Sequence, residues 1–243
     1  MMEKEMPDTH MIFNSPLHIS KADRIITQFN LKLHSQVLDI GCGEGEFLIR
    51  VAEHYEINGI GLDINERLIE KAQSKASQRV KLGNVVFQTK DLSDFSNQSS
   101  SYDLIICIGS EFIFGGYEAA LQKFKPLLTE KGLLLMGTIF WKQEPAKEYL
   151  HLMGGENPYF DHPTTLAKAS QKGFIPLYVC RSNDDEWDDF ESTVSQQKYL
   201  EALGSSSIPD VMQQIEKIKV WQNGYTKWGI NTMGFGFYLL RNA

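Results

Sequence analysis

Cysteine is scarce in this chain of 243 residues, and its pattern excludes two kinds of site. The three cysteines, Cys42, Cys107 and Cys180, are odd in number and widely spaced. They form neither the close pairs of a zinc site nor the dense framework of a disulfide-stapled secreted domain. We therefore expect reduced thiols, as in a cytoplasmic protein, and no metal.

Long apolar runs are also absent. The longest, residues 132–141, is about half as long as a membrane-spanning helix needs to be. The first residues, Met1–Glu5, lack the apolar core of a signal peptide. The sequence therefore predicts neither a membrane span nor a secretion signal.

Basic residues are in deficit, with 24 Lys and Arg against 31 Asp and Glu and a net charge of −7. A surface of this sign repels the phosphates of nucleic acids and anionic lipid, and no Lys/Arg cluster offsets it. We therefore expect neither nucleic acid nor a membrane as a partner. A P-loop and a Ser-His-Asp signature are missing as well, so the chemistry has to come from other residues.

Short apolar runs alternate with helical segments along the first two thirds of the chain. The runs have the composition of strands buried on both faces, and the segments between them have the period of amphipathic helices. Such alternation predicts right-handed βαβ units and a parallel sheet. The predicted strands are Gln36–Ile40, Asn58–Leu62, Val85–Thr89, Tyr102–Ile108 and Gly132–Phe140, and the predicted helices are Gly45–His54, Glu66–Lys75 and Tyr117–Leu128.

The remaining segments predict further helices and strands but no second domain. Ser20–Asp23 has the pattern of a capping box ahead of a first helix. No repeat or interdomain linker is visible, so we expect a flexible arm over residues 1–15 and one domain over 16–243, with helical lid elements near 142–172 and 184–228. The later predicted elements are helices at Thr164–Lys172, Asp184–Leu203 and Pro209–Trp221 and strands at Ile175–Cys180 and Met233–Arg241.

Closely spaced glycines follow the first buried strand. Gly41, Gly43 and Gly45 lie between that strand and a helix, where glycine permits a tight turn and lets a ligand approach the backbone. The start of the helix offers unpaired N–H groups to an anionic group. Tight turns also use glycine for purely structural reasons, so the trio alone leaves the function open.

Acidic residues at the next two strand ends favour a nucleotide site. Asp63 ends the second strand about twenty residues on, where Rossmann-type proteins place an acid on ribose hydroxyls. Such a bond contributes about 1.5–3 kcal/mol. Asp91 follows the third strand and can accept the amine of adenine, with Ile64 and Leu92 flanking the ring. The alternative for both acids is a helix cap or turn residue.

The glycine spacing G-x-G-x-G, preceded by Asp39, resembles motif I of class I S-adenosylmethionine-dependent methyltransferases. Four later landmarks come in the order of that family. The likeness covers Asp39–Gly45, Asp63, Asp91, the strand Tyr102–Ile108 with Gly109-Ser110-Glu111, and Leu127–Leu134.

This resemblance implies a fold and a cofactor. The fold is an α/β, Rossmann-like three-layer sandwich whose seven-stranded, mostly parallel sheet has the order 3-2-1-4-5-7-6, with the last strand antiparallel. The cofactor is S-adenosyl-L-methionine, which leaves as S-adenosyl-L-homocysteine. The cofactor-binding residues that it implies are Asp39, Gly41, Gly43, Gly45, Asp63, Ile64, Asp91, Leu92 and Ser110.

The rest of the chain resembles the UbiE/Coq5-like small-molecule branch, and within it bacterial proteins of the YjhP type. The similar segments include Gly109–Gly116, Phe140–Ala146 and Glu186–Phe190. This likeness implies methyl transfer to a small-molecule substrate by a monomer or homodimer. It leaves the acceptor atom, O, N, C or S, undetermined.

Loops at the carboxyl ends of the strands supply the candidates for chemistry. Glu111 is a candidate base or substrate contact, against an exposed loop carboxylate. His162 is a second candidate base, with Asp161 beside it, against a surface histidine. Trp141, Tyr159 and Trp187 are candidate substrate contacts, although Trp187 equally fits a packing role in a lid helix.

Two other functions stay open at this stage. A nicotinamide-dependent oxidoreductase uses the same fold, but its glycine spacing is usually G-x-G-x-x-G. A sensor that binds S-adenosylmethionine or its product without turnover fits every motif named above.

Overall fold

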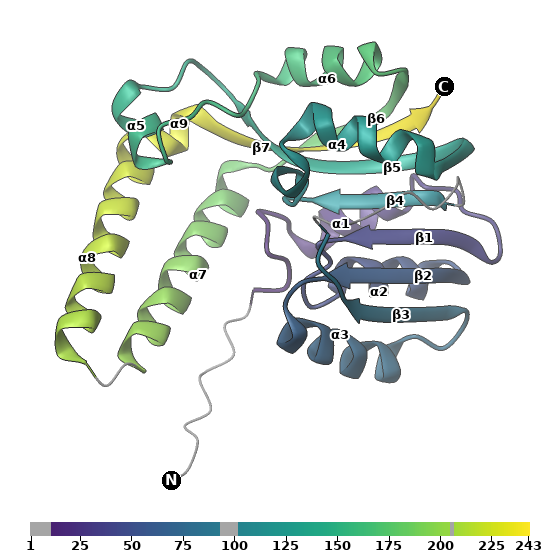
Figure 1. Cartoon of the computed structure of the whole chain (residues 1–243), viewed down its shortest axis with the longest axis horizontal. Coiled ribbons are helices and arrows are strands. Elements are labelled where there is room, and N and C mark those ends of the chain that lie inside the picture. Colours follow the sequence, from purple (N-terminus) through teal and green to yellow (C-terminus); the bar gives the residue numbers. More distant parts are fainter. Residues whose placement is uncertain (1–10, 93–101, 205–206) are drawn as a thin grey trace, which may run out of the picture.

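One seven-stranded sheet forms the centre of the computed structural model, which describes residues 11–92, 102–204 and 207–243. Its order is β3-β2-β1-β4-β5-β7-β6 (Figure 1), and β7 runs antiparallel to both of its neighbours. The predicted fold class, strand order and antiparallel last strand are confirmed. The strands are β1 (Ser35–Ile40), β2 (Ile57–Asp63), β3 (Asn84–Thr89), β4 (Tyr102–Ile108), β5 (Leu128–Trp141), β6 (Phe174–Arg181) and β7 (Met233–Asn242).

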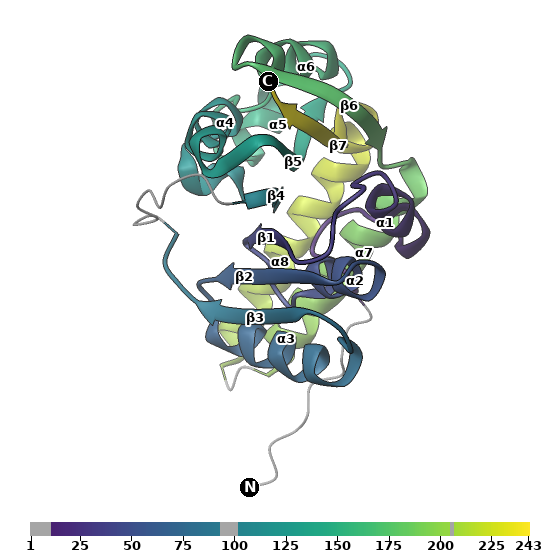
Figure 2. The same cartoon turned by 90° about the vertical axis from the view of Figure 1, so that its right-hand side faces the viewer.

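Helices cover both faces of this sheet. Adjacent residues of β1 point to opposite faces, and Val37 and Leu38 accordingly lie in two separate apolar clusters. One cluster contains residues of the first three helices, and the other contains residues of α4 and α6. Figure 2 shows α4 and α1 on opposite sides of the sheet. The helices are α1 (Ile19–Ile26), α2 (Glu46–His54), α3 (Glu66–Arg79), α4 (Tyr117–Phe124), α5 (Lys147–Leu152), α6 (His162–Gln171), α7 (Asp184–Leu203), α8 (Ile208–Gly224) and α9 (Ile230–Thr232).

Short 3₁₀- and π-helical turns also occur between these elements. A 3₁₀ turn η1 (Glu111–Phe114) follows β4, and a π-helical turn η3 (Tyr225–Gly229) follows α8. A second 3₁₀ turn, η2 (Lys125–Leu127), follows α4, so the predicted helix Tyr117–Leu128 is too long. Pro126 lacks the N–H group that the next helical bond needs, and α4 therefore ends at Phe124.

The first helix begins differently from the prediction. The capping box expected at Ser20–Asp23 is wrong, because α1 already begins at Ile19 and its N-cap is His18, whose side chain accepts from the Ser20 N–H. A capping box does occur at α7, where Asn183 and Glu186 bind each other's backbone N–H groups. An imidazole acceptor at an N-cap is not among the usual capping residues.

The segment before α1 packs against the domain. Phe13 and Ser15 are buried, and the Phe13 ring meets Phe47 of α2 edge to face at 6.2 Å. Farther along, the Lys21 ammonium and the Glu186 carboxylate form a buried ion pair that ties α1 to the start of α7. Of the flexible arm predicted over residues 1–15, residues 1–10 lie outside the described residues, and the described part is packed through Phe13 and Ser15 and not loose.

All parallel strands end at one edge of the sheet, and α7 and α8 stand opposite that edge. In Figure 1 the arrowheads of β1 to β4 point toward these two helices. Among the described helices, none has both the length and the apolar character to cross a membrane.

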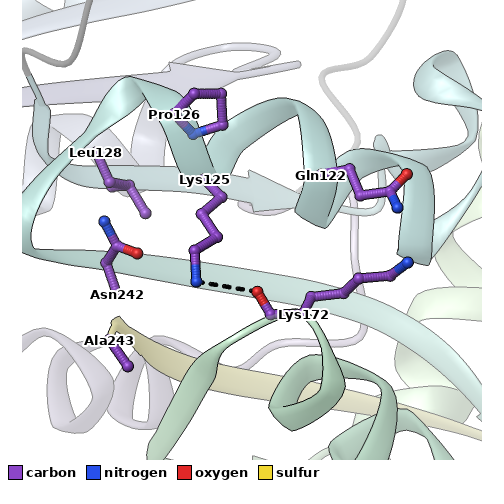
Figure 3. Close-up of a pocket in the computed structure, with 7 residues that line it drawn as sticks. All are labelled: Gln122, Lys125, Pro126, Leu128, Lys172, Asn242 and Ala243. Carbon is purple, nitrogen blue, oxygen red and sulfur yellow. Dashed lines mark hydrogen bonds between the residues drawn. The ribbon is translucent and has the colours of Figure 1, made fainter.

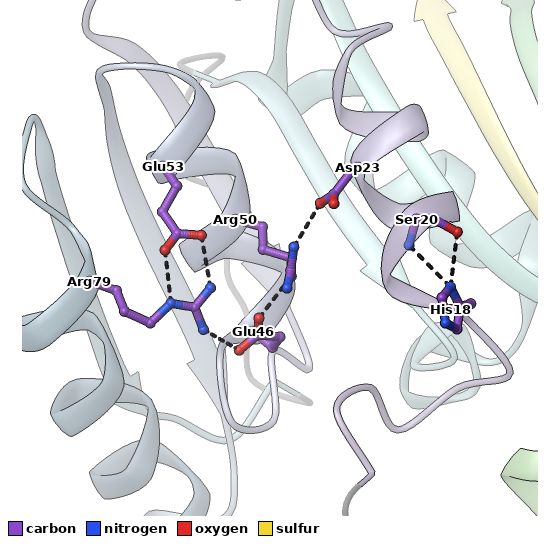
Figure 4. A network of polar contacts seen from close by, with 7 residues as sticks. All are labelled: His18, Ser20, Asp23, Glu46, Arg50, Glu53 and Arg79. Carbon is purple, nitrogen blue, oxygen red and sulfur yellow. Dashed lines mark hydrogen bonds and ion pairs between the residues drawn. The ribbon is translucent and has the colours of Figure 1, made fainter.

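A network of ion pairs fixes α2, the helix that begins at the glycine loop. Glu46 at its first turn is buried and binds Arg50 at 2.8 Å and Arg79 at 2.6 Å (Figure 4). Arg50 also binds Asp23 of α1, and Arg79 of α3 also binds Glu53. The network therefore joins three helices on one face of the sheet.

Replacing Glu46 by alanine tests this network. Glu46→Ala should lower the free energy of unfolding by about 2–3 kcal/mol, below the range for a fully buried pair because both arginines keep a second acid. Urea unfolding monitored by circular dichroism measures it. The control is Glu216→Ala, whose exposed carboxylate has a 3.7 Å pair with Lys219 and should change stability by less than about 0.5 kcal/mol. Equal effects of the two substitutions would contradict a structural role for the network.

Candidate functional site

The Gly41–Gly45 loop is fastened to the end of β2. The Gly41 and Cys42 N–H groups both donate to the Leu62 carbonyl, at 2.8 and 3.0 Å. Gly41 has φ +69°, and a Cβ there would lie 2.0 Å from the Ser110 Oγ. Glycine is thus required because the ends of β1 and β4 touch at this point.

Gly43 has a different reason to be glycine. Its φ is +54°, but a Cβ added to it would meet nothing within 4 Å. A side chain here would fill open space above the loop instead of clashing with the protein. The space over the middle of the loop is therefore a part of this edge that a ligand can approach.

Asp63 lies directly against the glycine loop. One carboxylate oxygen accepts the Gly43 N–H at 2.9 Å, and the other accepts the Asn65 N–H at 2.9 Å. The carboxylate therefore joins the loop after β1 to the turn after β2. It is a structural clamp as well as a candidate ligand contact.

The residues after β3 lie next to Asp63. Thr89 is the register partner of Asp63, and the Lys90 N–H donates to the Asp63 carbonyl at 2.8 Å. Asp91 therefore follows at the same edge, and its side chain is exposed. The three predicted landmarks, the glycine loop, Asp63 and Asp91, are brought together by the parallel register.

The two predicted apolar neighbours differ in their surroundings. Ile64 is 68% exposed beside Asp63, so it is free to cover a ligand. Leu92 is buried and packs with Leu38 and Leu62 in the core on the α4 face. Leu92 can therefore support a ligand site from behind, but its side chain does not project from the surface.

Asp39 is buried beneath the glycine loop. Burial, together with the nearby Asp63 carboxylate, raises the pKa of Asp39 to about 8. Its side chain is therefore mostly protonated at neutral pH. A cation bound above the loop would favour the ionised form, because an opposite charge lowers the pKa of a carboxyl group.

Glu111 is buried as well, which differs from an exposed loop carboxylate. Its Oε1 accepts the hydroxyl of Thr138 on β5, while its Oε2 has no hydrogen-bond partner. Burial raises the pKa of Glu111 above its usual range, against a smaller lowering by the Thr138 bond. This edge of the sheet therefore holds, next to Ser110, a buried carboxylate oxygen that has no hydrogen-bond partner.

His162 does not pair with Asp161. Asp161 is the N-cap of α6 and accepts the Thr164 N–H at 2.7 Å, whereas the His162 Nδ1 lies 2.8 Å from the hydroxyl of Tyr238. The expected Asp161–His162 pair is thus wrong, because the acid is engaged by the helix start. Burial and the nearby Arg181 lower the pKa of His162.

The aromatic candidates separate into two groups. Trp141 and Tyr159 lie together near the end of β5, with ring centroids 5.6 Å apart, and the Trp141 indole N–H donates to Asn157 at 2.6 Å. Tyr159 also lies close enough to Glu111 for that carboxylate to contribute to its raised pKa. Trp187 is buried against Phe190 and Phe235. The structure places it as a packing residue at the base of α7.

Sequence reasoning missed three polar side chains around Glu111. Thr138, Tyr117 and Tyr238 are all buried on the α4 face of the sheet. Each stands in a segment whose pattern predicts core, and no motif marks them. The pairing of β5 with β7 brings Thr138 and Tyr238 together, and α4 adds Tyr117.

A cavity at another part of the surface contains none of the predicted site residues. It has a volume of about 580 Å³ and is lined by residues such as Lys125, Leu128 and Asn242 (Figure 3). Leu128 begins β5, so the cavity lies at the edge opposite the glycine loop. The Lys125 ammonium is already bound to the Lys172 and Gly173 carbonyls.

Over the described ranges, no three His, Cys, Asp or Glu side chains are placed to share a metal ion.

Comparison with known proteins identifies the family. A family model for the methyltransferase domain matches residues 31–198, which include the glycine loop, Asp63, Asp91 and Glu111. The chain belongs to this methyltransferase family. The predicted class of enzyme is confirmed at the level of the family, and the narrower UbiE/Coq5-like branch stays a prediction.

Three relatives illustrate the similarity. Protein YjhP of Escherichia coli is 25% identical over 95% of this chain and 94% of its own, and its crystal structure superposes with a TM-score of 0.85 over 98% of both chains at 20% identity in the structural alignment. A methyltransferase of Geobacter sulfurreducens, solved with S-adenosyl-L-homocysteine, gives 0.84 at 22% identity over 95% of this chain and 94% of that one. A ubiquinone biosynthesis O-methyltransferase of Coxiella burnetii is 26% identical over 67% of this chain and 73% of its own.

Substituting Asp39 by asparagine tests its protonation. The folded protein keeps a proton on Asp39 up to about pH 8 that the unfolded chain releases near pH 4, so wild-type stability falls as the pH rises through this window. Asp39→Asn cannot titrate. Relative to wild type, its free energy of unfolding should rise by about 2–4 kcal/mol between pH 5 and pH 8. Urea titrations at several pH values measure this, and a difference that stays constant with pH contradicts the assignment.

Proposed function

We propose that this protein transfers a methyl group from S-adenosyl-L-methionine to a small-molecule acceptor. The observation that carries the proposal is the meeting of the glycine loop with Asp63 beside an open space, at the edge where Asp91 follows β3. Membership of the methyltransferase family supports the reaction class. The bound S-adenosyl-L-homocysteine of the Geobacter sulfurreducens protein, which has the same fold, supports the cofactor.

The residues at this edge fit the parts of that cofactor. Asp63 would hold the ribose hydroxyls, Asp91 and the exposed Ile64 would hold the adenine, and Leu92 would support Ile64 from the core. Asp39 would meet the methionine ammonium group, whose charge favours the ionised carboxylate. The loop Gly41–Gly45 and Ser110 would lie along the methionine portion. When bound, the sulfonium supplies a methyl group already activated for displacement.

The protein's own contribution to the reaction is mainly alignment. Holding two reactants in line is worth about 7–11 kcal/mol for well-oriented groups. Glu111 would receive the proton of an acceptor that must lose one, since its Oε2 is unpaired and its raised pKa makes it a stronger base than an ordinary carboxylate. Tyr159 would form an aromatic wall next to it, supported from behind by the buried Trp141.

Helices α5, α7 and α8 would close the acceptor site, as the predicted lid elements near 142–172 and 184–228. Their position opposite the carboxyl ends of β1 to β4 supports this role. The name of the Coxiella burnetii relative, an O-methyltransferase of ubiquinone biosynthesis, supports an acceptor that is a small molecule.

Calorimetric titration tests the cofactor. S-adenosyl-L-homocysteine should bind with micromolar affinity, and NADH should not bind. Asp63→Ala should weaken the affinity at least tenfold, about 1.4 kcal/mol, and lower the stability of the free protein by about 1–3 kcal/mol because the Gly43 N–H loses its partner.

A matched control separates these two effects of Asp63. Asp103 also accepts a backbone N–H at 2.9 Å, from Gln36, but it lies near the start of β4 at the opposite edge. Asp103→Ala should cost similar stability and leave the affinity unchanged. Equal losses of affinity in the two variants would contradict the assignment of Asp63 to the ribose. Binding of NADH without binding of S-adenosyl-L-homocysteine would contradict the proposed cofactor.

A panel assay tests turnover. Phenols, amines, carboxylates and thiols are incubated with S-adenosyl-L-methionine, and release of S-adenosyl-L-homocysteine is followed. Turnover of at least one class, abolished or reduced at least a hundredfold in Glu111→Gln with cofactor affinity intact, is the expected result. Tight cofactor binding with no turnover across the panel would instead indicate a sensor.

A further inference from the structure

A group of polar side chains lies in the apolar core beside Glu111, with hydrogen bonds from Thr138 to Glu111 and between Tyr238 and His162. It consists of Glu111, Thr138, Tyr117, Tyr238 and His162, and we refer to it as the polar cluster. The first four are buried, and His162 is half-buried at the start of α6. Buried polar groups are normally few and fully paired, so a cluster of this size calls for a function.

The inner end of the polar cluster lacks hydrogen-bond partners. The Oε2 of Glu111 and the hydroxyl of Tyr117 are both buried without one. Each such group costs about 1–3 kcal/mol of folding free energy. Glu111 directly follows Ser110, which touches the glycine loop at Gly41. The unpaired atoms therefore lie next to the proposed site of methyl transfer.

The middle of the polar cluster follows the pairing of β5 with β7. Thr138, which donates to Glu111, is the register partner of Gly236. The Tyr238 hydroxyl lies over Gly236, 2.5 Å from where a Cβ would be. Only a residue without a side chain leaves room for that hydroxyl beside Thr138. The Tyr117 ring lies edge to face with Tyr238 at 6.3 Å. Burial raises the pKa of Tyr117, and Tyr238 and Glu111 add to that shift.

The outer end of the polar cluster reaches the surface. The Tyr238 hydroxyl is 2.8 Å from the His162 Nδ1, and the imidazole packs on Phe140 with ring centroids 5.0 Å apart. The charged groups that face His162 are Arg181, which lowers its pKa, and Asp161, which raises it by less. A half-exposed imidazole exchanges protons with water near neutral pH.

We propose that the polar cluster carries the proton released by the methyl acceptor from Glu111 to His162 and into solvent, with water or side-chain motion joining the unpaired Tyr117 hydroxyl to Glu111 and Tyr238. This inference rests on the proposed function. The new bond joins the acceptor atom to the methyl carbon, the carbon–sulfur bond breaks, and sulfur keeps its electron pair. The acceptor's proton passes to the Glu111 carboxylate, and one proton leaves from His162.

The inference narrows the acceptor class. A path for a proton is useful only if the attacking atom carries one, as in a hydroxyl, an amine with an N–H, or a thiol. Tertiary amines and thioethers need no such path. Among the described residues, four buried side-chain polar atoms have no hydrogen-bond partner, and two of them, on Glu111 and Tyr117, belong to this cluster.

The experiment follows a proton on Glu111 without needing the acceptor. The protein with saturating S-adenosyl-L-homocysteine is transferred to heavy water at several pH values between about 4 and 7, around the ordinary range of a carboxyl group, and the shift of the protonated carboxyl stretch is followed by time-resolved infrared spectroscopy. Glu111→Gln identifies the band by removing it. Tyr238→Phe, Tyr117→Phe and His162→Gln should each slow the exchange at least tenfold.

Matched controls exclude a general effect of substitution. Tyr178→Phe on β6 and His151→Gln on α5 change the same residue types outside the polar cluster and should leave the exchange rate within twofold of wild type. Thermal midpoints of all variants check that each is folded, and Tyr117→Phe replaces Tyr238→Phe if the latter is not.

The possible failures are distinct. Exchange as fast as wild type in all three cluster variants overturns the proton path, as does the absence of a carboxyl band that depends on Glu111. Neither result contradicts the proposed function. That function is contradicted if calorimetric titration shows no binding of S-adenosyl-L-homocysteine or if the panel assay shows no turnover. Once an acceptor is found, His162→Gln should lower its turnover at least tenfold, with partial rescue by added imidazole.

Discussion

The site of this protein depends on one carboxylate that joins two strand ends. Asp63 accepts backbone N–H groups from Gly43 and from Asn65, so the loop after β1 and the turn after β2 are held at a fixed separation. Hydrogen bonds to a charged acceptor are about twice as strong as neutral ones. Because the carboxylate is fixed by the backbone, its position above the sheet edge does not depend on a bound ligand.

Three carboxyl groups lie at this edge of the sheet, some buried and one at the surface of the loop. Asp39 is buried beneath the loop, Asp63 lies against it and Glu111 lies beyond Ser110, and burial raises the pKa of both Asp39 and Glu111. A carboxyl group whose pKa is raised holds a proton more readily than usual, and a positive charge nearby favours its ionised form. The same edge can therefore favour a cationic cofactor and take up a proton, two properties that methyl transfer from a sulfonium to a protonated nucleophile requires.

Local patterns predicted the parts of the site that depend on neighbours in sequence. The glycines of the loop, the acid at the end of β2 and the acid after β3 were all placed correctly at one edge, because parallel register aligns successive strand ends. The burial of Leu92 and the packing of Trp187 against Phe235 were not predictable. Both depend on which distant element covers the residue, and periodicity carries no information about that.

The sequence by itself determined the alternation of strands and helices and the glycine turn, since both follow from short-range spacing and steric rules. Its resemblance to a family, and not its spacing, implied the strand order that the sheet has. Only the tertiary structure decided what surrounds Glu111. Thr138 comes to it from β5, and Tyr238 comes to lie beside that strand because β7 pairs with it antiparallel. Pairing of strands about a hundred residues apart is fixed by packing of the whole sheet, and a local pattern does not encode it.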